Sequence, residues 1–227
     1  MRYWIMLLLF CMPAAAGEPI KFGVKVGVPV TDLFEPVSGG RPSQFLSSSA
    51  KTKRYAVGLS AAIKLRHRIG FEIDGLYRRV NYDLYSRSSI SSGDGGTIYS
   101  WSGVTGNRLD FPLLFRWSPL RPLYVVAGPT FAVHYGFNQR IHRIQDLTLS
   151  GFSEQDLETS EISELGGRLS QAVTLGMGLD IPTGGVHVRP EVRYFHWIRQ
   201  AFNTDYYFKP KADEVTIFLG LEFGGKR

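Results

Sequence analysis

Hydrophobic and polar residues alternate with a period of two in eight separate stretches of the chain. In RLDFPLLFRW, residues 108–117, large apolar side chains fill the odd positions, whereas Arg108, Asp110 and Arg116 fall on even ones. Because successive side chains of a β-strand point to opposite faces, this pattern predicts strands with one apolar and one polar face. The predicted strands are residues 20–28, 54–66, 69–79, 108–117, 123–135, 171–181, 186–197 and 214–223.

Short and long connections alternate between these strands. Those after the second, fourth and sixth strands are short, and the other connections are long and mostly polar. An up-and-down order of strands collects all the long connections at one end, which is the asymmetry of membrane barrels. We therefore predict an all-β fold, an eight-stranded antiparallel up-and-down transmembrane β-barrel. Within the long connections, residues 95–103 are expected to prolong a hairpin, and residues 154–165 to form a short helix.

The polar face decides between a soluble and a membrane barrel, because alternation alone fits both. Aromatic residues gather at strand ends, as at membrane interfaces. Small residues accompany long charged ones on the polar face, which suits an eight-stranded interior just wide enough for side chains. The charges there nearly balance, and buried ions need partners. The predicted network of charges in the lumen comprises Lys25, Lys64, Glu72, Asp74, Arg78, Arg108, Asp110, Arg116, Arg189, Glu191, Arg193 and Glu222.

Pro112 interrupts the strand at residues 108–117, because proline has no backbone N–H to donate to a neighbouring strand. A closed barrel has no free edge at which such a residue is harmless. We expect a local bulge at Pro112, or a neighbouring carbonyl that is satisfied instead by an arginine of the lumen or by water.

The N-terminus has the layout of a secretory signal peptide. Arg2 precedes an apolar run of ten residues, and three alanines follow at positions 14–16. The predicted organisation is a signal peptide at residues 1–16 and a barrel domain at residues 17–227. Cys11, the only cysteine, belongs to the signal peptide, so the mature chain is expected to lack disulfides. The formal charge of +6 is moderate, and no run of five basic residues indicates nucleic acid as a partner.

Five stretches carry a family likeness: LDFPLLFRW at 109–117, LYVVAGPTF at 123–131, VTLGMGLDIP at 173–182, VRPEVRYFHW at 188–197 and VTIFLGLEF at 215–223. With them the chain resembles the bacterial outer-membrane β-barrel family, in particular its small, eight-stranded, porin-like proteins. The resemblance implies location in the bacterial outer membrane, contact with the lipid bilayer and insertion by the barrel-assembly machinery. One departure is that GGKR follows Phe223, whereas such proteins often end on an aromatic residue.

The sequence offers little catalytic or metal-binding chemistry. The five histidines show no HxH, HxxxH or HExxH spacing, so neither a metal nor another cofactor is expected. Ser170 with His134, or Ser100 with His196, are the pairs considered for an acyl-transfer site, but no GxSxG motif is present and no spacing sets a third partner. The chain is therefore predicted not to be an enzyme.

The predicted function follows from the filled lumen, since eight strands with charged side chains inside leave no aqueous channel. We expect a monomer with a structural role or a surface-interaction role through long external loops. Arg41, Lys51 and Lys53 in the first loop suggest lipopolysaccharide phosphates as a partner. Two alternatives remain: a secreted, lipocalin-like barrel that binds an apolar ligand, and a barrel enzyme that acts on lipid acyl groups.

Overall fold

The structure is a computed structural model that describes residues 20–32, 35, 38–39, 44–50, 55–66, 68–90, 95–148, 150–160, 165–202 and 210–224. The predicted signal peptide and the three basic residues of the first loop, Arg41, Lys51 and Lys53, lie outside the described residues. Every regular element of the described chain is a β-strand. No described helix is long and apolar enough to cross a membrane.

Eight strands form a closed ring. Each strand pairs antiparallel with two neighbours, and β1 closes the ring by pairing with both β4 and β12. The predicted fold class, an eight-stranded antiparallel barrel, is confirmed. The ring runs in the order β1 (Lys21–Pro29), β4 (Ala56–Arg66), β5 (Ile69–Ile90), β6 (Gly96–Trp117), β7 (Leu123–Leu147), β9 (Leu169–Leu179), β11 (Val186–Arg199) and β12 (Asp213–Phe223).

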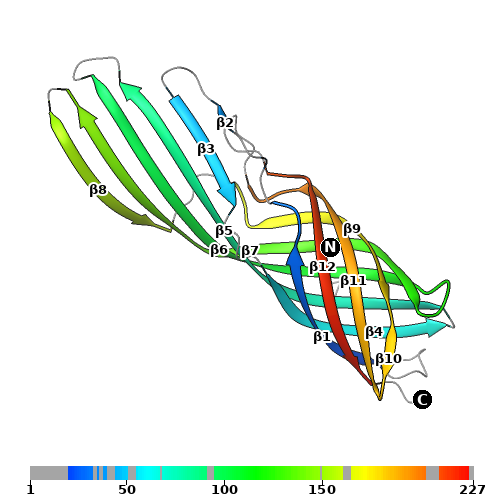
Figure 1. The fold of residues 1–227 in the computed structure, drawn as a ribbon. Helices are drawn as coiled ribbons and strands as arrows, with labels where there is room; N and C mark the ends of the chain where they lie inside the picture. The colour runs from blue at the N-terminus through cyan, green and yellow to red at the C-terminus, as the bar shows by residue number, and fades with distance from the viewer. Residues whose placement is uncertain are drawn as a thin grey trace, which may run out of the picture.

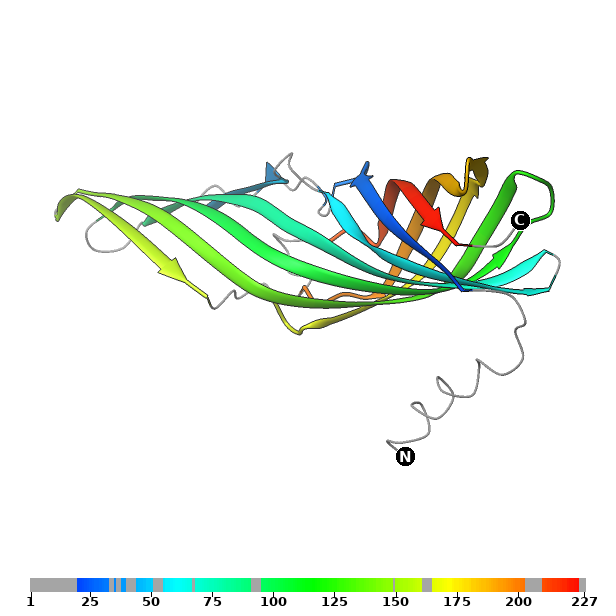
Figure 2. The same cartoon turned by 90° about the horizontal axis from the view of Figure 1, so that it is seen from below.

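Three of these strands are far longer than the barrel, and they continue beyond it as an extended sheet (Figure 1). There β5, β6 and β7 are flanked by β3 (Gln44–Ala50) on one side and β8 (Gly151–Thr159) on the other. The two-residue strand β2 (Ser38–Gly39) pairs with β3, and β10 (Ile181–Thr183) pairs with β11. We call the part formed by β2, β3, β8 and residues 79–90, 95–107 and 136–147 the extension; Figure 2 shows its curvature.

The extension confirms one prediction and overturns another. Residues 95–103 do prolong the hairpin, because β6 begins at Gly96. The helix expected at residues 154–165 is wrong where the structure describes that segment, since residues 151–159 form β8. Every residue of β8 pairs with a residue of β7, and this ladder outweighs the weak local preference of an acidic stretch for a helix.

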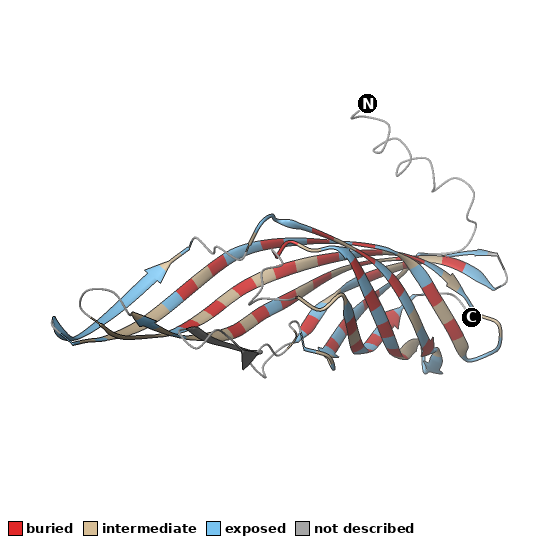
Figure 3. Ribbon diagram, turned by 90° about the horizontal axis from the view of Figure 1, so that it is seen from above, coloured by how far each residue is buried: buried red, intermediate tan, exposed pale blue. Residues whose placement is uncertain are grey.

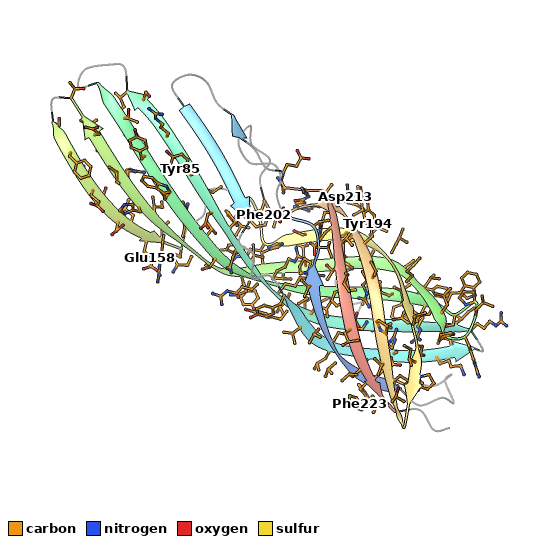
Figure 4. All side chains as sticks on the ribbon, in the orientation of Figure 1. Tyr85, Glu158, Tyr194, Phe202, Asp213 and Phe223 are labelled. Atoms are coloured by element: carbon orange, nitrogen blue, oxygen red, sulfur yellow. The ribbon has the colours of Figure 1, made fainter. Side chains whose placement is uncertain are left out.

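The barrel has two unlike ends. Arg68 and the short connections at residues 118–122 and 180–185 lie at one end, which we call the turn end, together with Phe223. The extension leaves from the opposite end, the extended end, near Tyr194 and Asp213 (Figure 4). At this transition Gly136, with φ of +60°, lies in a bulge of β7, so that both His134 and Phe137 face inward and are buried.

Burial alternates along the barrel strands, and the polar side chains are the buried ones (Figure 3). On β1, for example, Lys25 is 1% exposed, whereas Phe22 and Val28 are 63% and 60% exposed. Aromatic residues of the outer face lie near both ends of the barrel. Those toward the turn end are Phe22, Phe71, Phe115, Trp117 and Phe223, and those toward the extended end are Tyr55, Tyr77, Tyr135 and Tyr194. Between these two groups, Phe111 pairs with Phe131.

The bulge expected at Pro112 is wrong. Pairing between β5 and β6 lapses near this proline, yet Ile73 pairs with Leu113 and Leu76 with Asp110 in one unbroken register. The extended backbone of a strand suits the fixed φ of proline, and the pairs on either side hold the register without an extra residue. The alternative expectation, that an arginine of the lumen or a water satisfies the neighbouring carbonyl left without a proline N–H, stays a prediction.

Inward glycines make room for large side chains in the narrow interior, and this can be tested at Gly27. A Cβ at Gly27 would lie 2.5 Å from the ring of Phe218, which is 1% exposed and has no space to move. We expect Gly27→Ala to lower the free energy of unfolding by about 1–3 kcal/mol, as overpacking does. Urea unfolding in detergent, followed by tryptophan fluorescence, would measure it. The matched control is Gly75→Ala, where a Cβ meets nothing within 4 Å; equal losses in both variants would contradict the prediction.

Candidate functional site in the barrel interior

The structure places the twelve charged residues predicted for the lumen network inside the barrel or at its mouth. Arg116 is 12% exposed and Lys64 is exposed, and both line the turn end. The other ten are buried: Lys25, Glu72, Asp74, Arg78, Arg108, Asp110, Arg189, Glu191, Arg193 and Glu222.

Glu72 is the centre of the first ionic cluster. One of its carboxylate oxygens, Oε1, accepts from Lys25 and lies 2.8 Å from Nη2 of Arg193. The other oxygen, Oε2, lies 2.7 Å from Nη2 of Arg189. The four side chains come from β1, β5 and β11, so this single carboxylate joins opposite walls of the barrel.

Arg193 extends the cluster across the lumen with all three of its guanidinium nitrogens. Its Nη1 lies 2.6 Å from Oδ2 of Asp74, and its Nε lies 2.5 Å from Oε1 of Glu191. Lys25 lies 3.1 Å from the same oxygen of Asp74. The Tyr124 hydroxyl donates to Glu191 over 3.3 Å. Cations and carboxylates thus alternate in space, which offsets the cost of taking each from water.

A second ionic cluster lies nearer the extended end. Glu214 accepts from Arg78, and its Oε2 lies 3.1 Å from Nη2 of Arg108. Asp110 bridges the same two arginines, with its carboxylate oxygens 2.6 Å from Nε of Arg78 and 2.8 Å from Nε of Arg108. The Thr216 hydroxyl accepts from Arg78 over 3.0 Å. Two arginines therefore share two carboxylates.

Aromatic rings separate the two clusters, and the sequence prediction did not include them. The guanidinium carbons of Arg78 and Arg193 lie 5.6 Å and 5.2 Å from the ring centroid of Phe218. Arg78 also lies 5.0 Å from the centroid of Phe195. Stacking of guanidinium on rings stabilises a desolvated cation. Strand parity was the signal available, because Phe218 falls on the same face of β12 as Glu214 and Glu222.

An apolar cluster follows the second ionic cluster at the extended end. The Phe202 ring makes edge contacts with Tyr82 at 6.2 Å, Phe137 at 5.9 Å and His134 at 5.4 Å between centroids. Its buried members are Val80, Tyr82, Val104, Phe137 and Phe202, and Leu84 and Leu165 pack against them. From the turn end outward, the interior thus passes from ionic through aromatic and ionic again to apolar.

Ser170 and His134, one of the two pairs considered from the sequence, do meet. Ser170 Oγ lies 3.0 Å from Nε2 of His134 and also accepts from the backbone N–H of Ala201 over 2.9 Å. Nδ1 of His134 has no hydrogen-bond partner among the described residues. Both side chains are buried beside a cavity of about 20 Å³, which has room for about one water.

The other pair, Ser100 and His196, is not brought together. Ser100 lies in the extension, opposite Ser86 and Arg143. His196 lies on the outer face of β11, and its Nδ1 is 2.8 Å from Oδ1 of Asp213. No group of three or more His, Cys, Asp or Glu side chains in the described part of the chain could hold a metal ion.

A larger cavity of about 890 Å³ lies at the turn end. Its inner side carries a chain of polar contacts from Arg116 to Lys21. Arg116 Nη2 lies 2.8 Å from Oδ2 of Asp180, whose Oδ1 lies 2.5 Å from Nδ1 of His187. Nε2 of His187 lies 3.5 Å from Nζ of Lys21.

Comparison with known proteins finds no family model and no curated protein that matches the chain. Among solved structures, Neisserial surface protein A (NspA) is similar at 13% identity, with 91% of this chain and 98% of that chain covered and a TM-score of 0.36. The translocator domain of the autotransporter NalP from Neisseria meningitidis is similar at 9% identity, with 93% and 90% covered and a TM-score of 0.30.

The dependence of the barrel on its first ionic cluster can be tested with Glu72→Gln. The amide keeps the volume but removes the charge that compensates Lys25, Arg189 and Arg193, and breaking a buried ion pair costs about 3–5 kcal/mol. We expect a loss of unfolding free energy of that size in urea titrations of the detergent-solubilised barrel.

The matched control is Glu158→Gln in the extension. Hydrogen bonds from Asn138 and Arg140 lower the pKa of the Glu158 carboxyl, but this group is fully exposed to solvent. Exposed ion pairs contribute little to stability, so this variant should unfold like the wild type. A Glu72→Gln barrel as stable as the control would contradict the assigned role of the cluster.

Proposed function

We propose that this chain is a bacterial outer-membrane β-barrel protein with a filled polar lumen, and that it acts structurally or in surface interactions through its external part. This proposal rests on which side chains of the barrel face inward and which face outward. Charged residues such as Glu72 and Arg193 are fully buried, whereas outward residues such as Leu59 and Met177 are 67% and 60% exposed. Water would favour the opposite order, and lipid favours this one.

The outer face matches the cross-section of a bilayer. Aromatic residues lie on it toward both ends, where their rings would meet the two interfaces. The shortest full barrel strands, such as β1 with nine residues and β12 with eleven, have the length that tilted strands need to cross the hydrocarbon. Closure of the ring leaves no unpaired strand edge in lipid.

The interior argues against the lipocalin-like alternative. A barrel that carries an apolar ligand needs an apolar cavity inside and charged side chains outside. Here ion pairs and rings occupy the middle of the barrel, and the cavity of about 890 Å³ at the turn end is lined by several basic side chains.

The geometry also favours a structural role for Ser170 and His134 over an enzymatic one. Both side chains point inward, away from lipid, and the adjoining cavity of about 20 Å³ cannot hold an acyl chain. Nδ1 of His134 has no described acceptor to orient the ring, which a triad needs. We assign the pair to anchoring the backbone of Ala201 at the mouth of the barrel.

We assign the turn end to the periplasm and the extension to the cell exterior, since long connections of such barrels lie outside. The outer face of the extension carries contacting rings: Trp101 lies 5.3 Å from Tyr85, 6.1 Å from Tyr99 and 5.8 Å from His142 between centroids. Exposed aromatic clusters are typical of interaction surfaces.

We retain lipopolysaccharide as the proposed partner of this protein. We also retain a monomer as its proposed oligomeric state and the barrel-assembly machinery as its proposed route of insertion.

Membrane insertion can be tested by fractionation and gel mobility. We expect the protein in the outer-membrane fraction, extracted only by detergent. In gels, the unheated sample should migrate differently from the boiled one, because a closed barrel keeps its compact shape until heat breaks its strand pairing. If the protein is found in the soluble fraction and has the same mobility before and after boiling, the proposed function is refuted.

Orientation can be tested with single cysteines, since Cys11 belongs to the predicted signal peptide. Glu154→Cys in β8 should react with a membrane-impermeant maleimide on intact cells, because this strand is exposed in the extension. Thr183→Cys at the turn end should react only after the outer membrane is permeabilised. The reverse order of labelling would refute the assigned orientation while leaving membrane insertion intact.

A further inference from the structure

The cavity of about 890 Å³ at the turn end has a strongly one-sided charge. Among the described residues, five basic side chains line it, from β1, β4, β6 and two turns, and Asp180 is the one lining carboxylate. The basic residues are Lys21, Lys64, Arg68, Arg116 and Arg121. This excess contrasts with the ionic clusters deeper in the barrel, where cations and carboxylates are closely matched.

Two carboxylates compensate part of this charge, and both are already shared. Asp180 contacts Arg116 through one oxygen and His187 through the other. Glu222 lies 3.7 Å from Lys21 and 4.0 Å from Arg116, but its Oε1 is only 2.7 Å from Nη1 of the deeper Arg189. Among the described residues, the five basic side chains of the cavity therefore outnumber these two carboxylates.

The inner end of the cavity is closed, so a solute would enter from the turn end. Arg116 stacks on the Tyr124 ring at 4.2 Å, and Arg189 stacks on the same ring at 4.4 Å. Tyr124 is fully buried and donates to Glu191 of the first ionic cluster. This layer fixes the Arg116 guanidinium and separates the cavity from the ionic interior.

We propose that this cavity binds a compact polyanion that carries phosphate or carboxylate groups. Concave walls of one sign, surrounded by material of low dielectric constant, concentrate field lines and attract counter-ions. Arginine and lysine together suit such a ligand, since guanidinium groups bind planar oxygens in pairs and ammonium groups act as compact charges. Because the turn end is assigned to the periplasm, this polyanion would be a periplasmic solute. That location rests on the proposed function, whereas the binding itself does not.

Binding can be measured by isothermal titration calorimetry on the full mature chain, folded in a neutral detergent. Inorganic pyrophosphate is the phosphate probe, and citrate is the carboxylate probe. We expect saturable binding of at least one of them, weakened as salt rises because screening reduces charge attraction. The better probe identifies which group the site prefers. Absence of saturable binding for both would overturn the proposal.

The site is assigned by a double variant, Lys64→Gln with Arg121→Gln, which removes two lining charges and leaves the contacts of Arg116 in place. We expect binding to weaken at least about tenfold, because the ligand loses its attraction to two positive charges. The control is Lys211→Gln, which removes one positive charge beside the small cavity at the opposite end and should bind like the wild type.

Heat-dependent gel mobility checks that each variant is folded before its titration is used. A folded double variant that binds as tightly as Lys211→Gln would refute the assigned cavity. If the protein binds anions but is found in the soluble fraction, the outer-membrane location is refuted and the anion site is not. The two proposals can therefore be refuted separately.

Discussion

The structure depends on the pairing of ionised groups that are buried inside the barrel. Glu72 contacts three cations from two strands, and Arg193 contacts three carboxylates in return. Each of these groups alone would cost several kcal/mol to bury, so the eight strands are stable only in the register that brings all of them together. The inward glycines serve the same constraint, because they leave the width that arginine and phenylalanine occupy.

The strands β5, β6 and β7 belong both to the closed barrel and to the extension, and their neighbours differ in the two parts. Inside the barrel, β5, β6 and β7 have neighbours on both sides, so no edge is left open. Beyond the barrel they separate from β4 and β9 and are flanked by β3 and β8 instead. Gly136 marks the boundary, where a bulge changes the phase of β7 and directs Phe137 into the apolar cluster.

Function is therefore expected at the two ends of the barrel and not along its axis. Matched ion pairs and stacked rings fill the middle of the lumen, which disfavours ion passage. At one end the extension presents Trp101 and neighbouring rings on its outer face. At the other end, basic side chains outnumber carboxylates among the described residues, and Lys64 and Arg121 lie on a cavity large enough for a solute. A rigid interior holds both surfaces in place.

The alternation along the chain by itself determined the eight barrel strands and which face of each turns inward, because side-chain direction in a strand depends only on parity. Of the twelve network residues predicted from this alternation, ten are buried, Glu72 and Arg193 among them. It could not find which ions pair, that Phe218 and Phe195 lie between the clusters, or that residues 151–159 form a strand and Pro112 no bulge. Those features were decided only by the tertiary structure, because they depend on contacts between different strands, which the pattern within one strand does not encode.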